Sequence, residues 1–268
     1  MVARLVNFVR HVRSISRLGA TPAAALKVAV TTCFLLISRR LGRARWDPIA
    51  LQIRIREWIG TCRVRDYADL EVLREILVDR EYDLVGGDPR TILDLGSHIG
   101  VSILYFHARW PKARIVGVEP DPATFALLEE NVSSLKGVEV VNVAVAGEDG
   151  TASFYRARDS WNSSLTPQGG HGTITVKTCT VPSLASRMGM SQIDLLKVDV
   201  EGAEEQVLGD IGGLEVNGIV AELHEDLMSG TPDAVFSCLE DFDITVGKQT
   251  VNRCTFVGSR RLSPPRPA

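Results

Sequence analysis

The residues best placed to do chemistry begin with an acid and two glycines in residues 94–100. An apolar strand is expected to run into a loop containing Asp94, Gly96 and Gly100, with Ser97 and His98 between the glycines. Gly96 allows the backbone to turn tightly beside a ligand, and Gly100 allows the next helix to approach the strand. Such a loop presents free backbone amides to a nucleotide-like molecule.

The spacing and charge of this loop distinguish two nucleotide cofactors. A dinucleotide fingerprint requires G-x-G-x-x-G, so that the pyrophosphate can sit on the helix N-terminus. This loop instead reads Asp-x-Gly-x-x-x-Gly. A carboxylate at Asp94 would repel a pyrophosphate and attract the ammonium of a methionine moiety. The charge therefore favours S-adenosylmethionine, and a nicotinamide-dependent oxidoreductase is the competing enzyme class.

The next two strand ends complete the expected nucleoside site. Glu119 and Pro120 follow the second strand, where a carboxylate can accept both ribose hydroxyl protons. Asp121 better suits a cap for the following helix. The third strand ends near Asn142 and Ala144, whose backbone groups could frame the adenine.

Charged side chains at the ends of two apolar strands are the catalytic candidates. Strand alternation places Lys197 and Asp199 on one side, where buried charges are costly unless used or paired. His224 follows the fifth strand, and Glu222 points the same way and could orient it. Asp199 and His224 are alternative general bases for a hydroxyl acceptor. Asp199 could instead bind the donor's amino group or hold Lys197, which could itself stabilise an alkoxide or merely neutralise Asp199.

A divalent cation is a further possibility at these strand ends. Asp199, Glu201, Glu204 and His224 carry suitable ligand atoms. Glu201 and Glu204, however, begin a predicted helix, where the dipole favours acids without any metal. The sequence therefore predicts no metal site.

Taken together, these motifs resemble the FkbM family of methyltransferases. The resemblance is carried by residues 94–100, residues 118–120, Asn131 and residues 196–204, and it extends from about residue 66 to about residue 223. It implies a Rossmann-like class I methyltransferase fold. It also implies S-adenosylmethionine-dependent O-methylation of a small-molecule or lipid-linked hydroxyl, such as that of a sugar, glycolipid or polyketide. A non-enzymatic interaction protein that retains the fold is the alternative.

Alternating apolar segments predict the elements that position these residues. Strands are expected at 91–95, 114–118, 138–145, 193–198 and 218–223, with helices at 99–109, 122–135 and 201–208 between them. This alternation predicts a mostly parallel sheet with helices on both faces. The segments at 242–246 and 252–257 predict a closing antiparallel pair. The core domain is therefore expected at 89–260, followed by a loose tail at 261–268.

A preamble at 47–88 is expected before this core. Its first part, 49–64, predicts a hairpin that turns near Gly60, followed by a helix capped by Asp69. The polar stretch 156–172 is expected to be a lid or a sugar-binding loop, or else a solvated excursion. It contains Trp161, Asn162, Ser163, Ser164 and His171.

Residues 1–46 have a different composition, with nine of the 30 basic residues of the chain and none of its 33 acids. The apolar stretch 22–37 is short for a membrane span and is flanked by arginines. It predicts either a helix on a phospholipid surface or a helix packed on the core or on a second subunit. The acidic remainder of the chain argues against nucleic acid. Five cysteines without metal-ligand spacing favour the cytoplasm. If the helix contacts phospholipid, the expected place is the inner face of the membrane.

Overall fold

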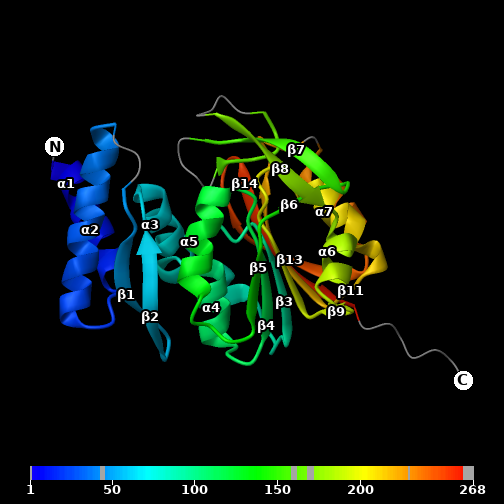
Figure 1. Ribbon diagram of the computed structural model, residues 1–268, viewed down its shortest axis with the longest axis horizontal. Helices are drawn as coiled ribbons and strands as arrows, with labels where there is room; N and C mark the ends of the chain where they lie inside the picture. Colours follow the sequence, from blue (N-terminus) through cyan, green and yellow to red (C-terminus); the bar gives the residue numbers. More distant parts are fainter. Residues whose placement is uncertain (1, 43–45, 158–161, 168–171, 229, 262–268) are drawn as a thin grey trace, which may run out of the picture.

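The computed structural model describes residues 2–42, 46–157, 162–167, 172–228 and 230–261 (Figure 1). Its central sheet has the strand order β13-β14-β12-β10-β3-β4-β5. In chain order these strands are β3 (Thr91–Leu95), β4 (Arg114–Val118), β5 (Val138–Val141), β10 (Leu195–Val198), β12 (Gly218–His224), β13 (Phe242–Gln249) and β14 (Arg253–Arg260).

The sheet has the predicted mixture of directions. β12, β10, β3, β4 and β5 pair in parallel. β14 pairs antiparallel with β12 on one side and with β13 on the other. Both the parallel core and the closing antiparallel pair are therefore confirmed.

Helices cover both faces of this sheet because its parallel strands are apolar on both sides. Ile92 and Leu195 belong to the core on one face, and their neighbours Leu93 and Leu196 belong to the core on the other. The first face packs against α4 (Val101–Arg109) and α5 (Pro122–Val132). The second face packs against α6 (Val181–Arg187), α7 (Glu204–Gly209) and α8 (Pro232–Cys238). Figure 1 shows these two layers on opposite sides of the sheet.

The N-terminal segment forms an outer layer at one end of the molecule (Figure 1). It comprises α1 (Val2–Ser16), α2 (Pro22–Arg40), β1 (Ile49–Ile55), β2 (Trp58–Val64), α3 (Tyr67–Leu73), a π-helical turn η1 (Arg74–Val78) and a 3-10 turn η2 (Glu81–Leu84). Ile15 of α1, Val28 of α2, and Leu51 and Ile53 of β1 are buried in the same hydrophobic core as α4. The segment is therefore packed on the first face of the domain.

Two local predictions for this segment are corrected by the structure. The hairpin turns at Arg56 and Glu57, where Arg56 adopts a left-handed φ of 53°, and not at Gly60, which lies inside β2. The cap of α3 is Asp66, because its side chain accepts a hydrogen bond from the backbone N–H of Asp69. The Asp69 carboxylate instead accepts a hydrogen bond from the backbone N–H of Arg65.

Several predicted elements are shorter or divided. The third strand is interrupted after Val141, and its end becomes β6 (Ala144–Val145), which pairs with β8 (Thr173–Cys179) beside β7 (Gly150–Tyr155). The fourth strand is divided into β9 (Gln192–Ile193), which pairs with β11 (Glu215–Val216), and β10. The helix expected from Glu201 begins at Glu204, because left-handed Glu201 and Gly202 form a turn first. A 3-10 turn, η4 (Asp210–Gly213), follows α7.

Candidate active site

A cavity opens at the carboxyl ends of the parallel strands, where ligands bind in sheets of this kind. Eight residues predicted from the sequence line it: Gly96, Ser97, His98, Glu119, Pro120, Ala144, Lys197 and Asp199. Three other predicted cofactor residues, Asp94, Gly100 and Asn142, do not line it. We call this space the donor cavity. The strand ends therefore bring together most of the predicted cofactor residues, although β3, β4 and β10 are far apart in the chain.

Gly96 is required by the backbone on the other side of the loop. Its φ of +81° lies in the left-handed region, and a Cβ atom there would lie 1.8 Å from the carbonyl oxygen of Asp199. Gly100 also has a positive φ of +91°, and a Cβ there would lie 2.7 Å from Leu128 Cδ1 of α5. The two glycines thus allow the loop to approach the end of β10 and α4 to approach α5.

Asp94 lies behind the wall of the donor cavity. Its side chain is fully buried, it accepts a 2.5 Å hydrogen bond from the Ser102 hydroxyl, and its Oδ1 lies 3.2 Å from Lys197 Nζ. Asp94 therefore does not line the cavity, and its carboxylate is paired with Ser102 and Lys197. The sequence indicated both Asp94 and Lys197, but it did not indicate that the two are paired.

Lys197 holds the loop and the strand ends together. Its ammonium donates to the carbonyl oxygens of Leu95 and Gly96, and it lies between Asp94 and Asp199, 3.4 Å from Asp199 Oδ2. Burial opposes its charge, but the two carboxylates outweigh burial and raise the pKa of Lys197. Of its two predicted roles, this geometry favours neutralising Asp199, because the ammonium already contacts both carbonyls and both carboxylates.

Glu119 is held at the end of β4 with its carboxylate on the donor cavity. Its two oxygens accept hydrogen bonds from the backbone N–H groups of His98 and Asp121, at 3.1 and 2.9 Å. Burial nevertheless raises the pKa of Glu119 to about 8. Asp121 caps α5, as predicted. Asn142 supports the same loop, because its side-chain amide donates to the carbonyl oxygens of Glu119 and Pro120.

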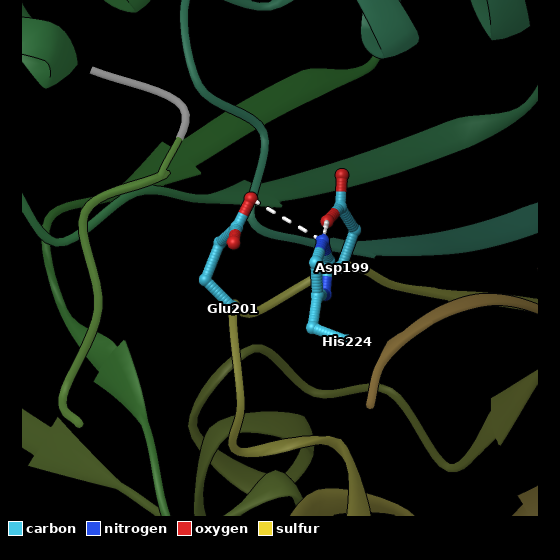
Figure 2. A group of neighbouring side chains, drawn as sticks. All are labelled: Asp199, Glu201 and His224. Atoms are coloured by element: carbon cyan, nitrogen blue, oxygen red, sulfur yellow. Dashed lines mark ion pairs between the residues drawn. The ribbon is translucent and has the colours of Figure 1, made fainter. Parts of the chain in front are cut away.

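A second group of charged residues surrounds His224 (Figure 2). Its Nδ1 lies 2.8 Å from Glu204 Oε1, and Glu204 in turn accepts hydrogen bonds from the backbone N–H of Gly202. Its Nε2 faces Glu201 at 3.4 Å, and Asp199 and Glu222 at 3.9 Å. We call Asp199, Glu201, Glu222 and His224 the carboxylate cluster.

The charges of this cluster depend on one another. Burial alone would lower the pKa of His224, but the hydrogen bond to Glu204 and the charges of Glu201 and Asp199 outweigh it and raise that pKa to about 10. Burial also opposes ionisation of Asp199, but Lys197 and then His224 lower its pKa below the ordinary value. At neutral pH the ring is therefore an imidazolium and Asp199 a carboxylate. Between the two predicted bases, this favours Asp199, because a charged imidazole has no free lone pair.

A second cavity, of about 340 Å³, lies on the other side of the cluster. Asp199 and Glu222 line the donor cavity, His224 lines this second one and Glu201 lines both, so the two cavities meet at the cluster. We call this space the acceptor cavity. Its other lining residues are Asn162, His224, Asp226, Leu227, Thr250, Val251 and Asn252.

The polar stretch 156–172 contributes to both cavities. Ser163 lines the donor cavity, and Asn162 lines the acceptor cavity and accepts a hydrogen bond from Arg253. Ser164 pairs with Tyr155 through its backbone. The predictions for Trp161 and His171 lie outside the described residues.

Sequence reasoning missed several residues of the donor cavity. Glu75 and Glu81 reach it from the π-helical and 3-10 turns of the preamble, and Arg253 reaches it from β14. Phe154 of β7 joins Val143 and Val145 in an apolar wall. No local motif marks these positions, and only the alternation in β7 could have indicated that Phe154 faces inward.

Comparison with known proteins identifies the family. Residues 94–242, more than half of the chain, match the family model described as "Methyltransferase FkbM domain". The chain belongs to the FkbM methyltransferase family. It is therefore an S-adenosylmethionine-dependent methyltransferase, and the matched residues include the glycine loop, the strand ends and the carboxylate cluster.

Three curated relatives of this FkbM methyltransferase illustrate the similarity. The 2-O-methyltransferase NoeI of Sinorhizobium fredii is 29% identical over 184 residues, covering 62% of this chain and 72% of NoeI. The hexuronic acid methyltransferase AglP of Haloferax volcanii is 30% identical, covering 60% of this chain and 65% of AglP. The 31-O-demethyl-FK506 methyltransferase FkbM of Streptomyces tacrolimicus is 27% identical, covering 65% of this chain and 80% of that relative.

The donor cavity of this FkbM methyltransferase suits S-adenosylmethionine chemically. Its lining includes several acids, among them Glu81, Glu119 and Asp199, and a cationic ligand would favour their ionised forms. Its apolar wall suits a flat purine. Acids other than Asp94 therefore line the cavity and are the candidates to face the ligand's ammonium.

Proposed function

We propose that this enzyme methylates a hydroxyl group of a polyhydroxylated small molecule, a sugar or a glycolipid headgroup in particular. The observation that carries the proposal is the carboxylate cluster, which lies between a donor cavity and a polar acceptor cavity. The family assignment removes the two alternatives that the sequence left open, a nicotinamide oxidoreductase and a non-enzymatic protein.

The donor-side roles follow from the walls of the donor cavity. Glu119 would accept hydrogen bonds from the ribose hydroxyls, while Ser97 and His98 line the turn beside the nucleoside. Glu81 would face the ammonium in place of Asp94, since Glu81 lines the cavity and Asp94 does not. Burial raises the pKa of Glu81 to about 8, so a nearby cation would favour its ionised form.

The acceptor-side roles follow from the chemistry of the second cavity. Asn162, Asp226, Thr250 and Asn252 supply amide, carboxylate and hydroxyl groups that can pair with several hydroxyls of one ligand. The names of two relatives support an oxygen acceptor, because one is a 2-O-methyltransferase and another acts on a hexuronic acid. A polyketide hydroxyl is the second acceptor class, supported by the name of the FK506 relative.

The reaction needs one proton acceptor and close alignment. S-Adenosylmethionine, when bound, supplies an electrophilic methyl group on its sulfonium sulfur. Asp199 would take the proton of the acceptor hydroxyl while the oxygen forms its bond to the methyl carbon and the S–CH₃ electron pair returns to sulfur. Lys197 would hold Asp199 in place through their ion pair. His224, charged and hydrogen-bonded to Glu204, would position Glu201 and Asp199.

The test is a screen of sugar, glycolipid and polyketide hydroxyls with methyl-labelled donor, followed by single-turnover rates at saturating donor. We expect methyl transfer to a sugar or glycolipid hydroxyl, and we expect Asp199→Asn to slow it by about 10²–10⁴-fold, the usual contribution of a placed base. Glu225→Gln, at an exposed acid next to His224, is the matched control and should retain the wild-type rate. Transfer only to nitrogen acceptors, or an undiminished rate for Asp199→Asn, would contradict the proposal.

A further inference from the structure

Helix α2 is turned with its large apolar side chains toward solvent. Leu26, Val30, Phe34 and Ile37, together with Leu41 at the C-cap, are between 39% and 80% exposed. Their spacing of four, four, three and four residues places them on one face of the helix. A soluble surface helix normally directs such a face to the core, so this exposed face needs a different explanation.

The inward face of the same helix is comparatively polar. Its buried residues are Val28, Thr31, Thr32, Leu35 and Ser38. The hydroxyl groups of Thr32 and Ser38 donate to the helix's own carbonyl oxygens at Val28 and Phe34. The protein therefore packs the side of α2 that carries the hydroxyl groups. The more apolar side remains largely exposed within the described residues, where only the Phe34 ring has an aromatic partner, Trp46.

The charged side chains of residues 1–46 all have one sign. Residues 1–46 contain nine basic residues and no acid, and Arg10, Arg13, Arg17, Lys27 and Arg40 are exposed on or beside α1 and α2. Val6 and Val9 of α1 add further exposed apolar surface. Apolar side chains together with surrounding basic groups fit a surface that offers both hydrocarbon and anionic phosphates.

We propose that α1 and α2 dock on an anionic lipid bilayer, with the exposed face of α2 lying in the headgroup region. By length and composition alone, α2 could also cross a membrane. Its inward face, however, packs into the same hydrophobic core as β1 and α3, so the folded protein leaves only one side of the helix for lipid. A surface-bound helix satisfies both observations.

A second copy of the chain fits this face less well. In a two-fold dimer the same patch meets itself, so the basic residues of one copy would face those of the other, with no acid in residues 1–46 of either copy. Anionic lipid removes that repulsion. Figure 1 places α1 and α2 at one end of the molecule, with β1, β2 and α3 between them and the central sheet, so lipid contact there leaves the sheet uncovered.

The experiment is co-sedimentation of the full chain with vesicles. Phosphatidylcholine vesicles are compared with vesicles of equal parts phosphatidylcholine and phosphatidylglycerol, at low and high salt. We expect binding to the anionic vesicles, weaker binding at high salt, and at least about tenfold weaker binding for Val30→Glu, which puts a charge into the apolar face. Val246→Glu replaces an equally apolar, 43% exposed residue on β13 and should bind like the wild type.

Three results would overturn the proposal. The first is equal binding by Val30→Glu and Val246→Glu, and the second is no binding of the wild type to anionic vesicles. The third is a dimer in solution that Val30→Glu dissociates, which would assign the face to a second copy. The assay contains neither donor nor acceptor, so its outcome is independent of the proposed reaction.

Discussion

The pH dependence of donor binding offers a sharp test of the role proposed for Glu119. Burial raises the pKa of this carboxyl to about 8, so most of the donor-free enzyme carries neutral Glu119 at about pH 7. A neutral carboxyl has lost an acceptor position, whereas the ionised form can accept both ribose hydroxyl protons. Donor affinity should therefore rise as the pH rises through about 8.

The magnitude follows from that pKa. If only ionised Glu119 binds the ribose fully, the apparent Kd at pH 7 should be about tenfold higher than at pH 9, because one pKa unit corresponds to a tenfold change in the ionised fraction. Glu119→Gln keeps one acceptor oxygen but loses a charge-assisted hydrogen bond worth about 1.5–3 kcal/mol. This predicts roughly 10- to 150-fold weaker binding than wild type at about pH 9, and a difference about tenfold smaller at about pH 7.

The same shift has a consequence for stability. A carboxyl whose folded-state pKa is raised favours the folded state below its unfolded pKa, and this contribution is lost as the pH rises through its folded pKa. Glu119 should therefore make the donor-free protein progressively less stable from about pH 4.5 to about pH 8. Thermal unfolding of wild type and Glu119→Gln across this range measures the difference.

Calorimetry with S-adenosylhomocysteine and with 5′-methylthioadenosine measures the binding. The second ligand has the ribose but no amino acid, so titration of the ligand ammonium and of Glu81 affects it less. We expect both ligands to show the rise with the wild type, and Glu119→Gln to show a flat profile for 5′-methylthioadenosine. A wild-type Kd that does not change with pH, or an equal slope in the variant, would refute the ribose assignment.

Two further predictions concern the loop and the carboxylate cluster. Gly96→Ala should lower the free energy of unfolding by at least about 2 kcal/mol and abolish donor binding, because the new Cβ would meet the Asp199 carbonyl at a left-handed φ. Chemical denaturation measures the loss. Gly213→Ala is the control, because open space surrounds that position, and its free energy of unfolding should stay within about 0.5 kcal/mol of the wild type. Ligand atoms of Asp199, Glu201 and His224 lie within 4.8 Å of one another, as a metal site would require. A proton on His224 Nε2, however, already offsets the negative charge of the carboxylates. Exhaustive dialysis against EDTA should therefore leave the methyl-transfer rate unchanged. A rate that falls on dialysis and returns with Mn²⁺ would instead identify these three residues as a metal site.

Local patterns in the sequence were enough to predict the scaffold and the edge of the sheet where the donor cavity lies. Apolar strands that alternate with amphipathic helices leave few arrangements other than a parallel sheet covered on both faces. Because the carboxyl ends of parallel strands meet at one edge, Gly96, Glu119 and Asp199 could be brought together from their positions at strand ends alone. These predictions rest on backbone preferences and on periodicity, which act over a few residues.

Which charged groups line the cavities and which are paired could be seen only once the elements were packed together. Asp94 and Asp199 look alike in the sequence, but Lys197 lies between them and leaves only Asp199 on the donor cavity. His224 could be a base as far as the sequence shows. In the structure, Glu204 of α7 lies 2.8 Å from its Nδ1, and this hydrogen bond keeps the ring protonated by raising its pKa. The strength of a charge–charge interaction depends on distance and burial, and both are set by packing between elements that no local pattern connects.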